Sequence, residues 1–262
     1  MRITTFGITD RGRKRPSNED DLALVDLTAD REIADLSLAN EEVGSSGVLL
    51  AVCDGVGGNR AGEVASALAL SRLVSEMEAL GDGCPRRTLF GVAVEHVNRA
   101  VWEKGHEDPR LEGMATTLTA AVLCRRKAVI AHVGDSRAYV LRQGHLRQIT
   151  RDQSFVQAMI ASGALTEEQA AHSPFRNVIL QAVGRKKTVD VALDALELEE
   201  GDTLLLCTDG LTEKIEPEGI AKALAGPDLR KALESLVTLA NERGGNDNIT
   251  ALAARVESLE EE

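Results

Sequence analysis

Short apolar runs separated by polar or glycine-containing turns mark the strands of this chain. Runs rich in Val, Leu, Thr and Ala that are too short for helices predict buried β-strands. They occupy residues 48–53, 115–124, 127–133, 137–142, 145–150, 203–207 and 249–256. The three runs between residues 127 and 150 are joined by the short turns GDS and QG, which predicts a meander of neighbouring strands.

Helices are indicated where apolar residues recur every three or four positions. This spacing predicts helices over residues 61–80 and 88–104. Three more helices are expected over residues 154–162, after the capping box TEEQ at 166–169, and from the N-cap Asp228 to Glu242. The strands cluster rather than alternating strictly with helices. The pattern therefore favours helices packed outside antiparallel sheets over a Rossmann or TIM arrangement.

The composition is that of a soluble globular protein. Of 262 residues, 43% are hydrophobic and 27% are charged, which excludes a disordered chain, a coiled coil and a disulfide scaffold. Aromatic residues make up only 2%, so the core must be aliphatic. Because 30 basic side chains face 42 acidic ones, the net charge is −12 and we expect neither nucleic acid nor an anionic membrane as a partner.

The chain contains no apolar run of about 18 residues, and its first residues lack the hydrophobic stretch of a signal peptide. No repeat or Pro-rich linker divides it, which predicts one domain over residues 1–256 and an acidic tail over 257–262. The acidic, irregular stretch 28–47 predicts a surface excursion between two strands.

The cysteines predict a reducing compartment. Cys53, Cys124 and Cys207 lie in apolar runs and are interpreted as buried, reduced thiols, whereas Cys84 precedes Pro85 in a predicted loop. No Cys or His spacing suggests a zinc site. The simplest location for such a chain is the cytoplasm.

Aspartates follow several of the predicted strands. The run LLAVC ends in Asp54-Gly55, and LLLCT ends in Asp209-Gly210. Asp135 lies in the turn VGDSR, and Asp247 precedes the last strand within GGNDNIT. An aspartate at a strand end places a carboxylate at the rim of the core, and the following glycine lets the backbone turn and bring its own carbonyl close.

Each aspartate alone has an ordinary structural interpretation, because Asp-Gly and Asn-Asp are common turn sequences. Several carboxylates, however, follow apolar strands that must pack in one core, although the spacing alone does not establish that they converge there. If they do converge, two of them at ~4 Å repel by roughly 4 kcal/mol at an effective dielectric of 20, and protons or cations must neutralise them. Oxygen ligands without His or Cys indicate Mg²⁺ or Mn²⁺.

The N-terminal stretch RPSNED adds Arg15 and the carboxylates Glu19 and Asp20. A guanidinium is suited to clamp a phosphate through two parallel hydrogen bonds. The alternative is that Arg15 belongs to a solvated basic cluster with its neighbours Arg11, Arg13 and Lys14.

Taken together, the motifs resemble the metal-dependent protein phosphatases of the PPM (type 2C) family, and most of all its bacterial members. The resemblance spans residues 4 to 256 and is carried by Arg15 with NED (18–20), DGVGG (54–58), ATTLTAA (115–121), GDSRAY (134–139), CTDGL (207–211) and GGNDNIT (244–250). It implies an α+β fold, a four-layer αββα sandwich in which two antiparallel sheets face each other and helices flank them.

The same resemblance assigns the site. It implies two Mn²⁺ or Mg²⁺ ions per active site and a third, weaker one. Asp54 would bridge the two ions, and the Gly55 carbonyl would hold the second. The remaining implied roles are Asp209 and Asp247 at the first ion, Glu19 and Asp20 through water, Asp135 with Asp209 at the third ion, and Arg15 at the phosphate.

The implied reaction is hydrolysis of phosphoserine and phosphothreonine by direct attack of a metal-bridging hydroxide. The expected substrates are phosphorylated proteins of a cognate serine/threonine kinase, and the enzyme is expected to be a monomer. The alternative is a catalytically inactive regulatory binding module on the PPM fold. The presence of every matched carboxylate argues against it.

The chain departs from the family pattern at two positions. Val56 stands where eukaryotic relatives carry a histidine proposed as general acid, and Gln153 replaces the histidine of the bacterial DHS triplet. Residues 152–184 resemble the mobile flap of the bacterial members, which borders their site.

Overall fold

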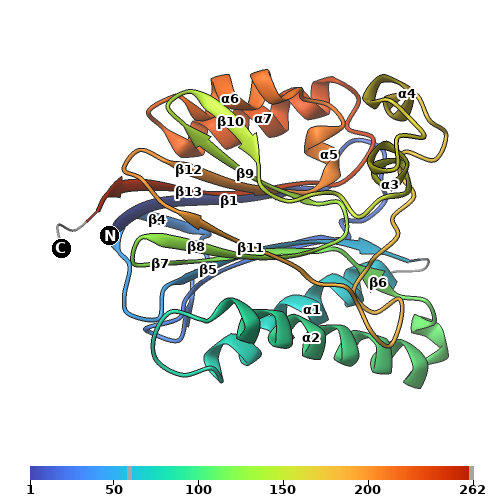
Figure 1. The fold of residues 1–262 in the computed structure, drawn as a ribbon, viewed down its shortest axis with the longest axis horizontal. Helices are drawn as coiled ribbons and strands as arrows, with labels where there is room; N and C mark the ends of the chain where they lie inside the picture. The colour runs from blue at the N-terminus through green and yellow to red at the C-terminus, as the bar shows by residue number, and fades with distance from the viewer. Residues whose placement is uncertain (58–60, 260–262) are drawn as a thin grey trace.

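The chain forms four layers, in which two sheets face each other between outer layers of helices (Figure 1). The computed structural model describes residues 1–57 and 61–259. Gly58 of the DGVGG motif and residues 260–262 of the predicted tail therefore lie outside the described residues. The arrangement confirms the predicted αββα sandwich.

The first sheet has six strands, all paired antiparallel. Their order is β10 (His145–Gln148), β9 (Arg137–Arg142), β12 (Thr203–Cys207), β13 (Ile249–Ser258), β1 (Arg2–Asp10) and β4 (Ser37–Glu42). Helices α6 (Pro217–Leu224) and α7 (Leu229–Glu242) cover its outer face (Figure 1), and α5 (Asp209–Thr212) follows β12 directly.

The second sheet is also antiparallel, and it carries the helices of the opposite layer. Its order is β11 (Ala192–Glu197), β8 (Lys127–Val133), β7 (Leu118–Cys124), β5 (Val48–Val56), β2 (Asp20–Asp26) and β3 (Arg31–Glu32), with β6 (Ala115–Thr116) paired to β5. Helices α1 (Ala61–Glu78) and α2 (Arg87–Glu107) pack on its outer face. A single 3₁₀ turn, Pro109–Leu111, follows α2.

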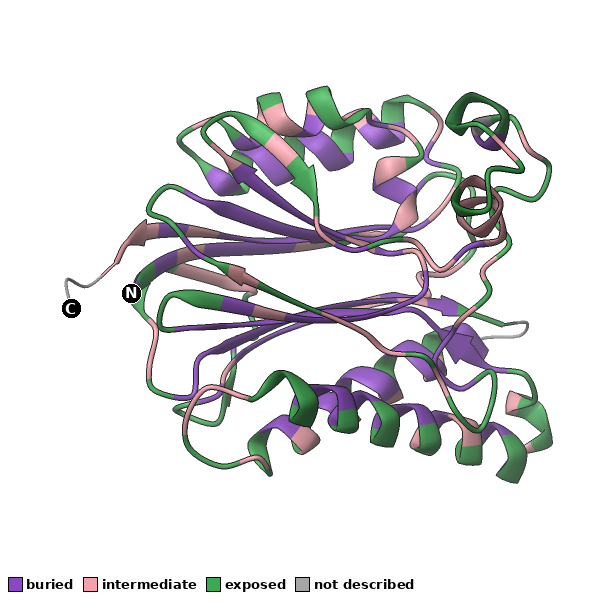
Figure 2. Ribbon diagram, in the orientation of Figure 1, coloured by how far each residue is buried: buried purple, intermediate pink, exposed green. Residues whose placement is uncertain are grey.

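The burial of strand β5 on both faces explains why its sequence is apolar without alternation. Leu49 and Ala51 face the layer of α1 and α2, whereas Leu50 and Val52 face the other sheet. A strand buried on both faces has no polar side, so periodicity of two disappears. Figure 2 shows the same result for the whole molecule, with buried strands inside and exposed residues on the outer sides of the helices.

The predicted meander over residues 127–150 is wrong. β8 belongs to the second sheet, whereas β9 and β10 form a hairpin in the first. The turn GDS therefore crosses between sheets, with Gly134 at φ 109°. A crossing and a hairpin both need a short glycine-containing turn, so the local sequence does not distinguish them. The crossing carries Asp135 to the edge where both sheets end.

Residues 28–47 are more ordered than predicted. They contain β3 and β4, and β4 pairs with β1 at the edge of the first sheet. The sequence pattern also did not predict six other elements, namely β1, β2, β11, α5, α6 and the 3₁₀ turn Pro109–Leu111. β13 runs to Ser258, so strand pairing extends into the first two residues of the predicted tail.

The cysteine prediction is partly wrong. Cys53 and Cys207 are free and buried, as expected, but Cys124 forms a disulfide with Cys84 across a Cα–Cα distance of 5.7 Å. The bond ties the connection between α1 and α2 to the end of β7. Cys84 lies 40 residues before its partner, so only the fold reveals the pair. The argument for a reducing compartment loses its main support.

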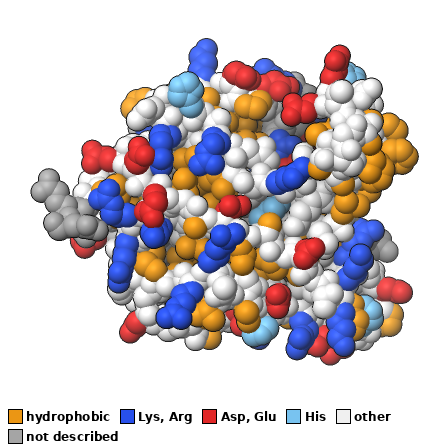
Figure 3. Space-filling view, in the orientation of Figure 1, with side chains coloured by type: hydrophobic (Ala, Val, Ile, Leu, Met, Phe, Trp, Pro, Cys, Tyr) orange, Lys and Arg blue, Asp and Glu red, His pale blue; other side chains and the backbone are white. Residues whose placement is uncertain are grey.

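On the molecular face of Figure 3, acidic and basic side chains are interspersed, and hydrophobic side chains gather toward the side that holds α3 (Phe155–Ala161) and α4 (Glu167–Ala171). Thr166 forms the predicted capping box at the start of α4, and Asp228 caps α7 as expected. Over the described part of the chain, none of the helices combines the length and the apolar character that a bilayer crossing requires.

Candidate active site

All predicted site residues except Asp20 line one cavity of about 420 Å³. The predicted residues in its wall are Arg15, Glu19, Asp54, Gly55, Asp135, Asp209 and Asp247. The wall also includes Val56, Gly57, Thr117, Asn177, Ile179 and Asn248. The sequence motifs, scattered over more than 230 positions from Arg15 to Asn248, thus meet at one place.

The carboxylates meet because strands of both sheets end at the same edge. Asp54 lies near the end of β5, Asp209 follows β12, and Asp247 precedes β13. Asp135 arrives on the crossing from β8 to β9. The convergence therefore depends on two sheets packed face to face and on no single local element.

Two other backbone segments approach position 55 so closely that only a glycine fits there. A Cβ at this position would lie 2.3 Å from the Gly62 carbonyl oxygen and 2.6 Å from the Glu19 carbonyl oxygen. The Gly55 amide donates to that same Glu19 carbonyl at 3.1 Å. Any side chain would therefore separate the end of β5 from the stretch that carries Glu19.

Asp20 lies behind the cavity wall. It pairs with Asp54 across β2 and β5, is 7% exposed, and accepts a hydrogen bond of 2.8 Å from the Thr208 hydroxyl. Burial raises the pKa of Asp20 to about 7, against the lowering effect of its hydroxyl donors. Glu19, the preceding residue, lines the cavity, whereas Asp20 does not.

The other carboxylates perturb one another strongly. Burial, followed by the charges of Asp20, Asp209 and Asp135, raises the pKa of Asp54 well above its usual range. The pKa of Asp209 is raised in the same way, by burial and then by Asp135 and Asp247. Burial also raises the pKa of Asp135, to about 6. Charged groups in such a cluster need protons or cations to offset their repulsion.

The donor set fits hard divalent cations. Asp209 Oδ1 is buried and has no hydrogen-bond partner. The neighbouring atoms that could coordinate a cation are carboxylate and carbonyl oxygens. Within residues 1–57 and 61–259, however, no three Asp, Glu, His or Cys side chains form a closed cage for an ion. The carboxylates instead lie around the wall of one cavity.

Arg15 lies in the cavity wall and is paired with one of the carboxylates. Its Nη2 donates to Asp247 Oδ2 at 2.6 Å, and its side chain is 50% exposed. The hydrogen bond to Asp247 raises the pKa of Arg15, and the charges of Asp247, Asp54 and Glu19 add to the effect. Arg15 thus presents a permanent positive charge beside the carboxylates.

Two polar residues that the sequence reasoning missed hold the site together. Thr117 Oγ1 accepts from the Asp54 amide at 2.9 Å and contacts Ser136 Oγ at 2.7 Å, which links the end of β5 to the turn of Asp135. Asn248 Oδ1 accepts from the Glu19 amide at 2.8 Å, and its Nδ2 donates to the carbonyls of Arg11 and Ser17, in the loop between β1 and β2. The hydroxyl-rich run ATTLT was the available signal for Thr117.

The predicted flap borders the cavity through Asn177 and Ile179. At its base, Gln153 Oε1 accepts from the Gly134 amide at 2.8 Å, and Gln153 Nε2 donates to the Asp190 carbonyl at 3.0 Å. The amide of Gln153 thereby joins the flap to the turn of Asp135 and to the segment before β11. A neighbouring cavity of about 450 Å³ separates the flap from α5 and shares Asp135, Asn177 and Asp209 with the first.

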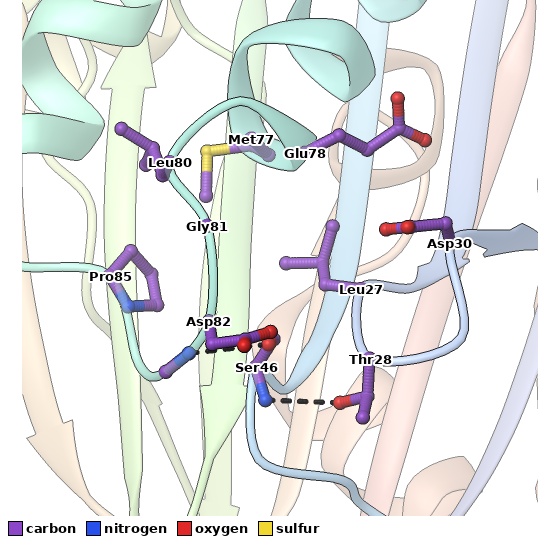
Figure 4. A pocket seen from close by; sticks show the side chains of 11 residues that line it. Leu27, Thr28, Asp30, Ser46, Met77, Glu78, Leu80, Gly81, Asp82 and Pro85 are labelled. Atoms are coloured by element: carbon purple, nitrogen blue, oxygen red, sulfur yellow. Dashed lines mark hydrogen bonds between the residues drawn. The ribbon is translucent and has the colours of Figure 1, made fainter.

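Another cavity lies at the opposite end of α1 (Figure 4). It measures about 180 Å³ and is lined by Met77, Leu27 and the loop that follows α1. Ser46 joins two of its walls, since its Oγ accepts from the Gly83 amide at 3.3 Å and its amide donates to Thr28 Oγ1 at 3.0 Å. This cavity contains none of the predicted site residues.

Comparisons with known proteins agree with this geometry. Residues 37–252 match the family described as protein phosphatase 2C. The serine/threonine protein phosphatase PstP of Mycobacterium tuberculosis is 40% identical over 211 residues, which cover 79% of this chain and 40% of PstP, so the chain spans less than half of that relative.

Two further comparisons cover nearly the whole chain. The serine/threonine phosphatase stp of Listeria welshimeri is 36% identical over 93% of this chain and 92% of its own length. A crystal structure of the catalytic domain of PstP in complex with two manganese ions superposes with a TM-score of 0.81, at 34% identity over 98% of this chain and 99% of that one.

Proposed function

The chain belongs to the protein phosphatase 2C family, and we propose from this that it hydrolyses phosphoserine and phosphothreonine in proteins with the help of divalent metal ions. One observation carries the proposal. Asp54, Asp135, Asp209 and Asp247 line a single cavity together with Arg15. A serine/threonine phosphatase needs both a cation site and a fixed positive charge for the phosphate.

Except for Asp20, which lies behind the wall, the residues proposed for the metal site line that cavity. Asp54 would be shared by two ions, with the Gly55 carbonyl, Asp209 and Asp247 as further ligands. Glu19 and Asp20 would act through water, and Asp135 would serve a third ion. When bound, divalent ions at such a site lower the pKa of water and offset the charge of phosphoryl oxygens. The two manganese ions of the PstP catalytic domain support Mn²⁺ or Mg²⁺ as the cofactor.

The chain's own side chains favour direct hydrolysis without a phosphoenzyme. Among the described residues that line the cavity, the only hydroxyl belongs to Thr117, and it is engaged with the Asp54 amide and Ser136. The same wall holds no cysteine, serine or histidine among the described residues, and its carboxylates are the groups proposed to bind the metal ions, which would leave them unavailable as nucleophiles. Arg15 would bind the phosphoryl oxygens, and Val56 offers no proton for the leaving group.

A small phosphate ester tests the proposal directly. We expect p-nitrophenyl phosphate to be hydrolysed with Mn²⁺ and not after chelation. Asp54→Ala should abolish turnover, because it removes the proposed shared ligand, whereas Asp82→Ala, an exposed aspartate far from this cavity, should not change it. Activity retained by Asp54→Ala at saturating Mn²⁺ would exclude the mechanism. Phosphopeptide binding without turnover by the unmutated protein would favour the inactive binding module.

We further propose that residues 1–256 act as one catalytic domain, with residues 152–184 as its flap. The proposed partners are phosphorylated proteins of a cognate kinase, and the proposed state is a monomer in the cytoplasm. The net charge of −12 supports the absence of nucleic acid and anionic membranes among its partners. The Cys84–Cys124 disulfide argues against a strongly reducing compartment, so thiol trapping in intact cells is the direct test of location.

A further inference from the structure

The hydroxyl of Thr208 connects the two sheets directly behind the proposed metal cavity. Thr208 follows β12 in the first sheet, and its Oγ1 donates at 2.8 Å to Oδ2 of Asp20, the first residue of β2 in the second sheet. Both residues are buried, with 0% and 7% of their surface exposed. Burial shields the bond from water, so it links two strand ends that no backbone ladder pairs.

The backbone position of Thr208 favours a different use of its hydroxyl. Thr208 is the N-cap of α5, where a threonine side chain ordinarily accepts a hydrogen bond from an amide of the first helical turn. The Thr208 side chain makes no such bond. Its Oγ1 instead accepts from the Thr250 amide at 3.0 Å, and its one proton goes to Asp20. The hydroxyl therefore joins the ends of β12, β13 and β2 and does not cap the helix.

Further polar contacts extend this connection across the first sheet. Thr250 Oγ1 lies 2.7 Å from Oγ1 of Thr9, its partner in the ladder between β13 and β1. Thr9 Oγ1 accepts from Asn18 Nδ2 at 2.8 Å, and Asn18 Oδ1 accepts from the Asp20 amide at 3.3 Å. The contacts thus form a closed ring that begins at the Asp20 carboxylate, passes through Thr208 and returns to the Asp20 backbone.

Residues proposed for the metal site lie on both sides of the Thr208 contact. Asp209 is the next residue in the chain, and Asp20 faces Asp54 across the ladder between β2 and β5. Asp209 and Asp54 both line the cavity. The Thr208 hydroxyl therefore connects the strand end that carries Asp209 with the strand ends that carry Asp20 and Asp54. A change at this contact would alter the spacing between Asp209 and Asp54.

We propose that Thr208 is a positioning residue of the metal centre, whose hydroxyl sets the spacing of the carboxylates that come from the two sheets. It touches neither the metal ions nor the substrate, because it is buried outside the cavity wall, and it acts through Asp20 and Asp209. The proposal rests on the metal-dependent activity proposed above and concerns the affinity for the ions, not for the phosphate. Residues that hold metal ligands in place commonly contribute about 10–100-fold to metal affinity.

Binding of Mn²⁺ in the absence of substrate tests the proposal. Thr208→Val keeps the shape of the side chain and removes the hydroxyl, whereas Thr208→Ser keeps the hydroxyl. The electron paramagnetic resonance signal of free Mn²⁺ gives the concentration that half-saturates the protein. We expect this concentration to rise by about tenfold in Thr208→Val and by less than about twofold in Thr208→Ser. At saturating Mn²⁺, KM for p-nitrophenyl phosphate should be unchanged in both variants.

Thr5→Val provides a matched control. Thr5 is 2% exposed, and its hydroxyl accepts from the Leu38 amide at 2.9 Å, within the first sheet and outside the cavity wall. Each Val substitution removes a buried hydroxyl that accepts from a backbone amide, so both should lower the Tm of the chelated protein. Only Thr208→Val should weaken Mn²⁺ binding. Equal weakening in both variants, or none in either, would leave Thr208 a purely structural role and overturn the proposal.

The remaining outcomes separate this proposal from the proposed activity. If the unmutated protein binds Mn²⁺ but hydrolyses neither phosphopeptides nor p-nitrophenyl phosphate, the activity fails, and the comparison of Mn²⁺ binding still decides the role of Thr208. A raised KM in Thr208→Val with unchanged Mn²⁺ binding would place Thr208 at the phosphate and overturn the proposal. Absence of Mn²⁺ binding by the unmutated protein would overturn both. If circular dichroism shows that Thr208→Val does not fold, Thr208→Ala replaces it with the same expected loss.

Discussion

Arg15 donates a hydrogen bond of 2.6 Å from Nη2 to Oδ2 of Asp247, a residue 232 positions later in the chain. The residue proposed to bind the phosphate is therefore hydrogen-bonded to a residue proposed to bind a metal ion. A cation held by Asp247 would therefore lie next to Arg15, which would place the proposed metal site and the proposed phosphate site side by side.

Arg15 should report on phosphate binding. We expect Arg15→Ala to raise KM for p-nitrophenyl phosphate by about tenfold with a smaller change in kcat, because one charge-assisted hydrogen-bond pair is lost. Arg15→Lys should restore little of it, since a single ammonium cannot replace the guanidinium fork. Lys14→Ala is the control for the basic neighbours. Wild-type kinetics for Arg15→Lys would return Arg15 to the solvated cluster.

Asp209 should destabilise the protein without metal and stabilise it with metal. We expect Asp209→Asn to raise the Tm of the chelated protein by about 2–6 °C, because it removes a buried charge that repels its neighbours. Mn²⁺ at 100 times its Kd should raise the Tm of the unmutated protein by about 5–10 °C and that of the variant far less. A lower Tm for the chelated variant would contradict the repulsion.

His132 should make the protein sensitive to mild acid. It is 1% exposed, its Nδ1 contacts Thr119 Oγ1 at 2.9 Å, and its Nε2 has no hydrogen-bond partner. The Thr119 hydroxyl donates to the Ser136 carbonyl, so it accepts from His132 Nδ1. Burial lowers the pKa of His132 to about 4, from 6.5 in the unfolded chain.

The sign of the effect follows from proton uptake. Above pH 6.5 neither state binds the proton. Between pH 6.5 and 4 the unfolded chain binds it and the native protein does not, so stability falls as the pH falls. From pH 7.5 to 4.5 the unmutated protein should lose about 2–3 kcal/mol more than His132→Asn in urea unfolding. His145→Asn, at an exposed position, is the control, and equal losses in all three proteins would contradict the assignment.

Gln153 should anchor the flap. Gln153→Ala removes the hydrogen bonds to Gly134 and Asp190, each worth about 1 kcal/mol. We expect trypsin to cleave after the exposed Arg176 roughly three- to tenfold faster in this variant, because local opening becomes more frequent. Gln143→Ala, in the turn between β9 and β10, should leave that rate unchanged. Equal cleavage rates for all three proteins would show that other contacts hold the flap.

Local pattern was sufficient for several parts of this protein. The limits of β8, β9 and β12 agree with their apolar runs, and the caps at Thr166 and Asp228 begin their helices as predicted. These features depend on burial, spacing and side-chain hydrogen bonds within a few residues. The Asp-Gly ends of two buried runs indicated carboxylates at the rim of the core for the same reason.

Other parts depended on contacts between distant segments. β1 and β2 carry alternating or mixed burial that the run-based pattern did not detect, and the GDS turn is compatible with a hairpin or a crossing. The family resemblance supplied the expected sandwich, whereas the residues alone did not reveal the sheet to which each strand belongs. Sheet membership is decided by long-range pairing, which no local period encodes.

The sequence by itself determined the chemistry available to this protein, namely carboxylates, a guanidinium and aliphatic strands without catalytic thiols or histidine pairs. The tertiary structure decided which of these groups face each other. Arg15 meets Asp247, Cys84 meets Cys124, and Asp20 lies behind the wall that Glu19 helps to form. The reason is physical, because side-chain type fixes what a group can bind, while only the packing of two sheets fixes the distance between groups hundreds of positions apart.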